Sequence, residues 1–338
     1  MVRVSRNKER VHSSMIWAVS LLCTVLLMVS AGNALAKPGK KSSTPKQVKE
    51  LVIGDRVIDI AYHLGVMPKI ISARMSVWPM GKRIKMAAKP LGCPKCITTS
   101  RKTAVADAIN KWGLKRIIIE KNDSYCLFMP QVRPTDVIPL LKGTNVKIEY
   151  VDFSKGIDSA IRQTAQIFGK QDKADALIAK YHKDMAMTKQ LMPAKPLNKR
   201  VVIIKGVYQP SSGKSLLSAE APGMYSDRFM LKPLGCTNVG EVFNPGDAKP
   251  AKGHYMIKKS RKGFDLSPLI AADPDVIVAV GDVMSVQKAL QGYAKKNPKL
   301  NNVKAIKDMA VYGLPGYIDA SVIEYPLILR QWAIALAH

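Results

Sequence analysis

The chain has 338 residues, of which 53 are Lys or Arg and 25 are Asp or Glu, and 47% of its residues are apolar. This composition excludes a wholly disordered chain, and five cysteines are too few for a disulfide-scaffold protein of this size. After the first forty residues no apolar run approaches the ~20 residues that cross a bilayer, which excludes a polytopic membrane protein.

The N-terminus has the pattern of an export signal. Residues 1–14 are basic, with a single acidic residue, Glu9, and an apolar run follows from Met15 to Gly32. Ala34-Leu35-Ala36 then supplies a small-residue cleavage site. This order predicts a secretory signal peptide over residues 1–36 and places the mature chain in the periplasm, with an uncleaved anchor helix as the alternative.

The net charge of +28 is spread along the sequence in short clusters. Nucleic-acid binding is one interpretation of such charge. Export argues against it, so we expect no nucleic-acid partner. An anionic ligand, the envelope surface and ordinary solvated lysines remain open interpretations.

Residues 37–49 are rich in Lys, Ser and Pro and are predicted to form a flexible leader. Over residues 50–168, short apolar runs then alternate with helical patterns. Strands are predicted at residues 51–53, 69–73, 116–120 and 146–151, with helices from Asp55 and over 104–112. This alternation predicts an N-terminal α/β lobe with a mostly parallel sheet.

From Ile157 the pattern becomes helical. In the stretch 172–192, apolar residues recur at spacings of three and four: Ala174, Leu177, Ile178, Tyr181 and Met185. At ~1.5 Å per residue such a helix spans roughly 30 Å, which is long enough to connect two lobes. We therefore predict an interlobe helix within residues 169–195.

The α/β alternation resumes over residues 196–338, which we predict to be a C-terminal lobe. Strands are expected at 200–205, 276–280 and 310–312, and helices at 226–232 and 323–337. The predicted fold class is therefore α/β, with two Rossmann-like lobes joined by a single long helix and a cleft between them.

Five stretches of the mature chain carry a family resemblance, and they occur in the family's order: Asp59–Gly65, Ile167–Lys170, Leu234–Val239, Leu266–Ile277 and Asn302–Tyr312. The chain over about residues 50–337 resembles the class III periplasmic substrate-binding proteins of ABC importers, the cobalamin, siderophore and haem type. In one stretch it departs from the pattern, because Cys236 stands where the family has a glycine.

The resemblance implies a binding protein rather than an enzyme, with no cofactor. It implies capture of a metal chelate (a ferric siderophore, haem or a corrinoid) and its delivery to an ABC-transporter permease, and we expect a monomer. The family docks on its permease through an acid on each lobe. Asp123 and Asp282, each following a predicted strand, are the candidates for this docking.

Seven residues are candidates for contact with the ligand. Trp78 and Met80 lie in a stretch that resembles the family's aromatic-Pro cleft loop, and Trp78 could stack on a planar ligand. Three tyrosines follow predicted strands and suit stacking or a phenolate–iron contact: Tyr125, Tyr208 and Tyr317. Lys214, in a stretch that ends like a phosphate-binding loop, could face an anion, and His254 lies in a predicted loop. Each could equally be an ordinary packing residue.

Cys93-Pro94-Lys95-Cys96 is the motif least expected from the family. With Cys126 and Cys236 it makes four mature cysteines, for which structural disulfides, a redox pair and a soft-metal site all remain open. The alternative function is therefore an exported thiol protein that acts in redox exchange or soft-metal carriage through Cys93 and Cys96. The sequence contains no G-x-S-x-G or H-E-x-x-H motif, so a hydrolase lacks a recognisable site.

Overall fold

The computed structural model describes residues 45–261 and 263–337. The predicted signal peptide, residues 1–36, lies outside these described residues, as does most of the leader. The leader's last residues are not irregular, however, because β1 begins at Lys46 and pairs in parallel with β2 from that residue on. The prediction of a flexible leader up to residue 49 is therefore wrong for residues 46–49.

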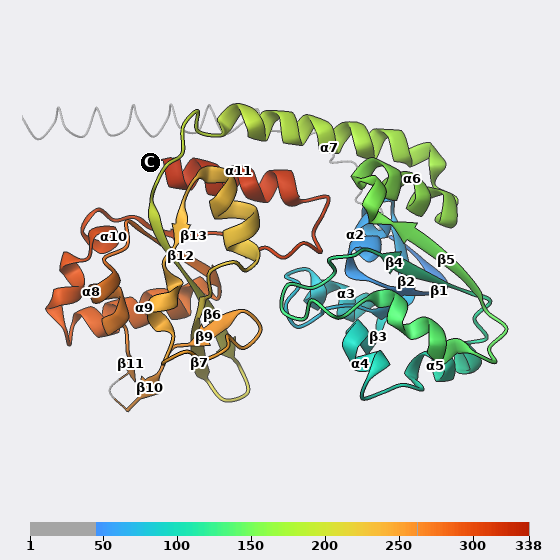
Figure 1. The fold of residues 1–338 in the computed structure, drawn as a ribbon, viewed down its shortest axis with the longest axis horizontal. Coiled ribbons are helices and arrows are strands. Elements are labelled where there is room, and N and C mark those ends of the chain that lie inside the picture. Colours follow the sequence, from blue (N-terminus) through green and yellow to red (C-terminus); the bar gives the residue numbers. More distant parts are fainter. Residues whose placement is uncertain (1–44, 262, 338) are drawn as a thin grey trace, which may run out of the picture. The chain divides into compact units, whose positions relative to one another are not determined.

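The first sheet is wholly parallel and has the order β3-β2-β1-β4-β5 (Figure 1). Its strands are β1 Lys46–Ile53, β2 Val66–Ser72, β3 Lys89–Gly92, β4 Arg116–Lys121 and β5 Lys147–Asp152. The helices of this part are α2 Asp55–His63, α3 Gly81–Ala87, α4 Pro94–Thr98, α5 Ala104–Trp112 and α6 Ile157–Phe168, with 3-10 turns at Pro134–Leu141 and Phe153–Lys155. We call this part, residues 46–168, the N-terminal lobe.

Burial explains why the strand signal was clear in this lobe. A parallel sheet covered by helices on both faces needs apolar side chains at successive positions, not alternate ones. Ile117, Ile118 and Ile119 in β4 are fully buried, as are Leu51, Val52 and Ile53 at the end of β1. The predicted mostly parallel α/β lobe is confirmed.

The second sheet is mixed and has the order β13-β12-β6-β7-β9, with β8 also paired to β6. Its strands are β6 Arg200–Gln209, β7 Lys214–Glu220, β8 Thr237–Asn238, β9 His254–Met256, β12 Val276–Gly281 and β13 Val311–Gly313. The longer helices are α8 Ser267–Ala272, α9 Val283–Ala294 and α11 Tyr325–Ala337, with α10 at Lys304–Lys307 and a small ribbon of β10 Lys259–Ser260 and β11 Gly263–Phe264. This part, residues 200–337, is called the C-terminal lobe.

Short irregular turns link several of these elements. The helix expected at 226–232 is a π-helical turn at Asp227–Leu231 followed by a 3-10 turn at Lys232–Leu234. Two more 3-10 turns lie at Gly240–Phe243 and Pro298–Asn302.

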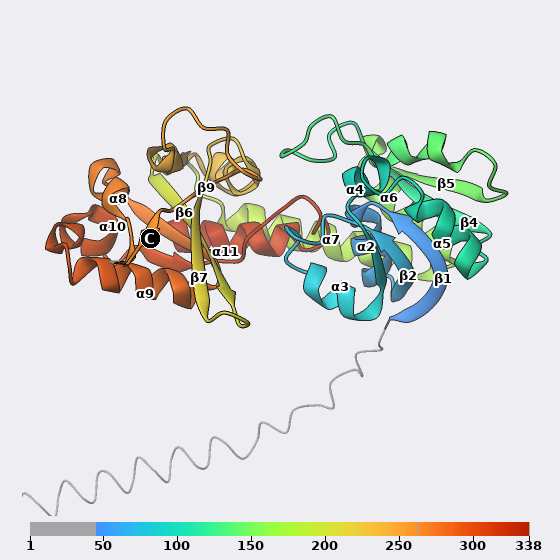
Figure 2. The ribbon, with the colours of Figure 1, turned by 90° about the horizontal axis from the view of Figure 1, so that it is seen from below.

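The strand β6 is longer than expected. It continues past Gly206 to Gln209 and forms an antiparallel hairpin with β7, in which Tyr208 pairs with Ser215. Figure 2 shows this hairpin projecting away from the helices of its own lobe. Residues 211–215 are therefore its turn and the start of β7, so the stretch that ends like a phosphate-binding loop is part of a β-hairpin.

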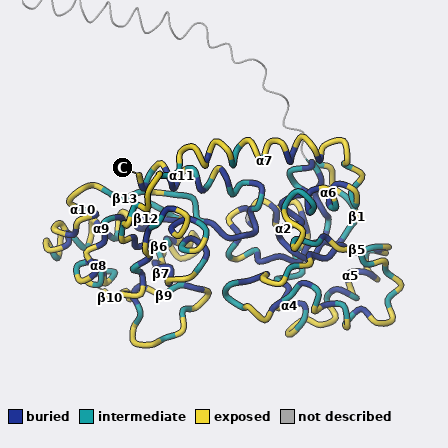
Figure 3. Tube along the Cα trace, turned by 45° about the horizontal axis from the view of Figure 1, so that its top comes forward, coloured by how far each residue is buried: buried dark blue, intermediate teal, exposed yellow. Residues whose placement is uncertain are grey.

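The chain passes from the first sheet to the second through α6 and α7 Gln171–Leu191, and α7 packs on both α6 and α11. This confirms the expected helix to within a residue at each end. Figure 3 shows α7 as largely exposed, and only a few of its residues, including Ala174, Leu177 and Ile178, are buried. Both sheets belong to the same compact unit of the chain, and the exact lobe boundaries stay a prediction.

Within residues 45–261 and 263–337, no helix combines the length and the apolar character needed to cross a membrane.

Gly206 allows β6 to lie directly against the turn that follows β12. A methyl group at position 206 would overlap the carbonyl oxygen of Asp282 and lie 3.2 Å from Cγ2 of Val286. We predict that Gly206→Ala destabilises the protein by about 1–3 kcal/mol, because neither backbone can withdraw without disturbing the sheet. The matched control is Gly292→Ala in the last turn of α9, where a methyl group meets nothing within 4 Å. That variant should gain about 0.5–1 kcal/mol. Urea unfolding of both variants tests the pair, and equal midpoints would contradict the prediction.

Candidate functional site

A cavity of about 520 Å³ is lined by residues of both lobes. The N-terminal lobe contributes Arg56, Asn122, Ser124, Leu127, Phe153 and Ile157. Tyr181 of α7 and six residues of the C-terminal lobe complete it: Arg228, Phe229, Tyr317, Asp319, Val322 and Tyr325. Several of these residues follow the carboxyl ends of β4, β5 and β13, the edge at which ligands bind in open α/β sheets. The volume lies in the range of small-molecule sites.

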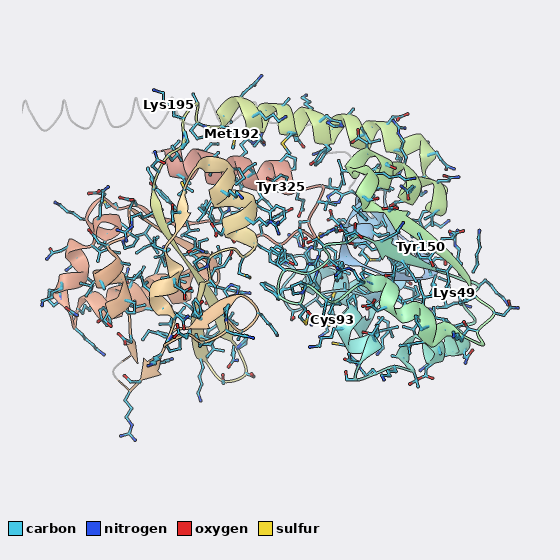
Figure 4. The ribbon with its side chains drawn as sticks, viewed as in Figure 1. Lys49, Cys93, Tyr150, Met192, Lys195 and Tyr325 are labelled. Atoms are coloured by element: carbon cyan, nitrogen blue, oxygen red, sulfur yellow. The ribbon has the colours of Figure 1, made fainter. Side chains whose placement is uncertain are left out.

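Aromatic rings form one wall of the cavity. The rings of Tyr317 and Tyr325 have centroids 5.3 Å apart, and Phe229 lies 5.5 Å from Tyr317 and 6.2 Å from Tyr325. Tyr325 stands at the first residue of α11 (Figure 4). Phe153 of the N-terminal lobe and Tyr181 of α7 add two further rings to the lining. Such a wall suits a ligand with flat, apolar parts.

Two arginines give the cavity positive charge, and they differ in solvent exposure and in ion pairing. Arg228 is exposed, and among the described residues its guanidinium has no ion-pair partner. Arg56 is buried and is already paired with Glu120 and Asp319. Arg228 is thus the group most available to an anionic part of a ligand.

A buried network of two arginines and three carboxylates borders the cavity and reaches it through Arg56 and Asp319. Nε of Arg74 lies 2.7 Å from Asp55 Oδ2, and its Nη1 lies 2.9 Å from Asp319 Oδ1. Arg56 donates from Nε to the backbone oxygen of Asp319 at 3.0 Å and from Nη2 to the Asp319 carboxylate. Its Nη1 lies 3.5 Å from Glu120 Oε1. The network spans both lobes, since Asp319 comes from the C-terminal lobe and the other four charged residues come from the N-terminal one.

Two tyrosines complete the network. The hydroxyl of Tyr125 donates to Asp55, and Nη1 of Arg74 donates to the hydroxyl of Tyr225 at 2.7 Å. Arg74 also lies over the Tyr125 ring, 4.3 Å from its centroid. Burial raises the pKa of Glu120 to about 7, although the guanidinium of Arg56 opposes this shift. Three carboxylates therefore share the charge of two guanidinium groups.

The segment 317–323 follows the last strand of the C-terminal lobe but packs on the N-terminal one. Ile318, Ala320 and Ile323 belong to the same apolar cluster as the residues of α2. The backbone N–H of Ile323 donates to Asp59 Oδ2 at 3.0 Å. The Asp59 carboxyl is fully buried, and burial raises its pKa well above the ordinary value. This segment thus holds Tyr317 and Asp319 at the cavity.

A buried carboxylate also positions the turn that carries Arg228 and Phe229. Glu220, at the end of β7, accepts hydrogen bonds from the backbone N–H of Ser226 at 2.6 Å and from its hydroxyl at 2.8 Å. It also accepts one from the N–H of Asp227 at 3.3 Å. Burial raises the pKa of Glu220 to about 7, against the effect of these hydrogen bonds.

Of the seven predicted ligand residues, Tyr317 lines the cavity. Trp78 and Tyr125 lie behind it, almost fully buried, and Trp78 Nε1 donates to the hydroxyl of Ser321 at 3.0 Å. Met80 is buried in the apolar cluster of the N-terminal lobe. The predicted strand-end tyrosine Tyr125 therefore supports the network rather than facing open space.

The other three predicted ligand residues do not line this cavity. Tyr208 is exposed within β6, because the strand does not end at residue 205, and Lys214 is exposed at the start of β7. His254 begins β9 and lies beside Phe128, with ring centroids 6.4 Å apart. Burial lowers the pKa of His254 to about 4.

The four described cysteines are free thiols. Cys93 and Cys96 are neighbours, whereas Cys126 and Cys236 are buried in different apolar clusters. In the part of the chain that the structure describes, no three His, Cys, Asp or Glu side chains are grouped to hold a metal ion. The soft-metal hypothesis therefore has no third ligand there.

Five residues at the cavity or in its network were not predicted as site residues: Asp55, Arg56, Arg74, Glu120 and Arg228. One signal was present, since Glu120 follows the run Ile117-Ile118-Ile119 near the end of β4 and Arg74 lies two residues after the end of β2. A charge at the end of a buried parallel strand lies at the carboxyl edge of the sheet, where sites form. The partner Asp319 lies 263 residues from Arg56, and no local pattern indicates that pairing.

The comparisons agree with this architecture. Residues 120–318, more than half of the chain, match the sequence profile of the family described as periplasmic binding protein. The chain therefore belongs to this family, which confirms the resemblance to class III substrate-binding proteins of ABC importers. No curated protein sequence matches the chain.

Three solved structures show the same two-lobed fold. The periplasmic haem-binding protein RhuT from Roseiflexus sp. RS-1, in apo form, has a TM-score of 0.51 at 15% identity, with 86% of this chain and 98% of RhuT covered. The periplasmic haem-binding protein BhuT in complex with two haems has a TM-score of 0.52 at 15% identity, with 86% of this chain and 100% of BhuT covered. The iron-uptake system-binding protein FeuA from Bacillus subtilis has a TM-score of 0.51 at 19% identity, with 85% of this chain and 93% of FeuA covered.

We predict that Asp319→Ala destabilises the protein by about 3 kcal/mol, because it leaves two buried guanidinium groups short of a partner. The matched control is Asp175→Ala, which removes one member of the exposed pair between Arg162 and Asp175. That change should cost less than about 1 kcal/mol. Chemical denaturation measures both. Equal losses in the two variants would show that the buried network does not hold the lobes together.

The raised pKa of Glu220 predicts a pH dependence of stability. Its ordinary value is 4.5 and its folded value about 7, so between these values the folded chain keeps a proton that the unfolded chain has released. The stabilisation is present below about pH 4.5 and is lost as pH rises through about 7. Wild type should therefore lose about 1–3 kcal/mol more than Glu220→Gln between about pH 5 and about pH 8. Denaturation curves across this range test it, and parallel pH profiles for the two proteins would contradict it.

Proposed function

We propose that this protein is the periplasmic solute-binding component of an ABC importer, which captures a metal chelate and delivers it to the permease. The chelate is a ferric siderophore, haem or a corrinoid. The observation that carries the proposal is the cavity lined by both lobes, with an aromatic wall and the unpaired guanidinium of Arg228. The wall suits flat apolar parts of a ligand, and the guanidinium suits a carboxylate or a catecholate oxygen.

The family and the fold support this proposal. Two of the similar structures are named as haem-binding proteins and the third as an iron-uptake protein. The signal-peptide pattern of residues 1–36 supports action outside the cytoplasm. The protein acts as a monomer that performs no catalysis, and its partners are the chelate and the permease, not nucleic acid.

Docking on the permease is proposed to involve one acid on each lobe. Asp123 is exposed in the loop after β4. Asp282 directly precedes α9, and its carboxylate accepts a hydrogen bond from the hydroxyl of Ser285. Loss of transport without loss of chelate binding in Asp123→Ala and Asp282→Ala variants would separate docking from capture.

The first test is ligand binding by the purified mature protein. Haem, a ferric tricatecholate and cobalamin are titrated separately, with tryptophan fluorescence and the visible spectrum as readouts. We expect one of them to bind in a 1:1 complex. Failure of all three, with the protein folded, would overturn the chelate proposal.

We predict that Arg228→Ala weakens binding of the preferred anionic chelate about 10–100-fold, because it removes a charge-assisted hydrogen bond worth about 1.5–3 kcal/mol. Lys214→Ala is the matched control, since it removes a cation that does not line the cavity. It also tests the prediction that Lys214 faces the ligand. Isothermal titration of the three proteins decides, and a larger loss in Lys214→Ala than in Arg228→Ala would move the binding site to the β6–β7 hairpin.

A further inference from the structure

Cys93 and Cys96 form a pair of thiols outside the cavity. Cys93 directly follows β3, and Cys96 lies in the first turn of α4 with Pro94 between them (Figure 4 labels Cys93). Their sulfur atoms are 2.9 Å apart, and both residues are partly exposed. Neither lines the cavity, so the proposed chelate binding makes no use of them.

An arginine lies beside one of the two thiols. Gly92 has a φ of 118°, and a methyl group there would overlap Nη2 of Arg101 and lie 3.0 Å from Cβ of Cys96. The absence of a side chain at Gly92 therefore lets the Arg101 guanidinium lie next to Cys96. The backbone N–H of Arg101 also donates to the carbonyl oxygen of Cys96 at 2.9 Å, which fixes the chain at this point.

The two thiols are thereby made unequal. Burial would raise the pKa of Cys96, but the hydrogen bonds with Cys93 and the Arg101 guanidinium outweigh it, so the pKa of Cys96 is lowered. Burial raises the pKa of Cys93, and the hydrogen bond to Cys96 adds to the increase. A partly exposed thiol beside a cation is the more nucleophilic member of such a pair. Cys126 and Cys236, in contrast, are only 2% and 8% exposed.

We propose that Cys93 and Cys96 are a reversible dithiol–disulfide pair that exchanges electrons with an external disulfide. The thiolate of Cys96 attacks one sulfur of that disulfide, a mixed disulfide forms, and the other sulfur leaves as a thiolate that takes up a proton. Cys93 then loses its proton and attacks the sulfur of Cys96. The Cys93–Cys96 disulfide forms and the second external thiol is released, so the pair gives up two electrons and two protons to the external disulfide.

This activity is independent of chelate capture, and the geometry favours it over the other uses of a C-x-x-C motif. Among the described residues no third ligand joins the pair, so a closed metal site is not formed. A purely structural bridge needs no cation beside one of its sulfurs, whereas a nucleophilic thiol does.

The test uses the mature full-length protein and oxidised and reduced glutathione as the probe. The protein is equilibrated in buffers that differ in the ratio of reduced to oxidised glutathione. Free thiols are then alkylated and counted by mass spectrometry. We expect the pair to change from mainly dithiol to mainly disulfide over about a hundredfold range of the ratio. A pair that stays bridged in excess reduced glutathione, or stays reduced in excess oxidised glutathione, would overturn the proposal.

Trapping identifies the attacking thiol. Cys93→Ser should accumulate a glutathione adduct on Cys96 at least about tenfold faster than Cys96→Ser accumulates one on Cys93. Arg101→Ala should slow formation of the Cys93–Cys96 disulfide by oxidised glutathione, and Lys102→Ala, which removes a neighbouring exposed cation, should not. Circular dichroism confirms that each variant is folded. Equal adduct rates in the two cysteine variants, or equal slowing by the two charge variants, would contradict the assigned roles.

Discussion

The pairing of two buried arginines with three carboxylates is the constraint on which this structure depends. Arg56 and Arg74 are 6% and 3% exposed, and a guanidinium so far from water is costly unless carboxylates surround it. Asp55 and Glu120 lie in the same lobe as the arginines, but Asp319 belongs to the other lobe. The charges are therefore satisfied only when the segment 317–323 covers the carboxyl edge of the first sheet, and that placement creates the cavity.

The two arginines of the cavity differ in their pairing, because only Arg56 belongs to this network. Arg56 is held by Glu120 and Asp319, so it shapes the wall and has little charge left for a ligand. Arg228 stands on a turn fixed by Glu220 and keeps an unpaired guanidinium. The proposed recognition of an anionic ligand therefore depends on one positioned side chain, and it does not require the net charge of +28 that is spread over the whole sequence.

Local patterns predicted the fold well because burial dictates them. The run Ile117-Ile118-Ile119 can only be a strand covered on both faces, and the stripe on α7 marks the side that packs on α6. The site was harder to predict, since its charges pair across distances in sequence that no periodicity records. Gly206 shows a second limit, because the strand was expected to end at residue 205, whereas this glycine allows the close approach of Asp282 and β6 continues to Gln209.

The protonation of the tyrosines bears on whether the cavity can bind a metal directly through a phenolate oxygen. Burial raises the pKa values of Tyr317 and Tyr125 well above the ordinary value, and the hydroxyl of Tyr125 already donates to Asp55. Both side chains therefore resist the loss of a proton that a phenolate–iron bond requires. In the described part of the chain, no three His, Cys, Asp or Glu side chains are grouped to hold a metal ion. The proposed ligand is accordingly an intact chelate whose own atoms coordinate the metal, with Tyr317 and its neighbouring rings against the flat parts of the chelate and Arg228 at its charged edge.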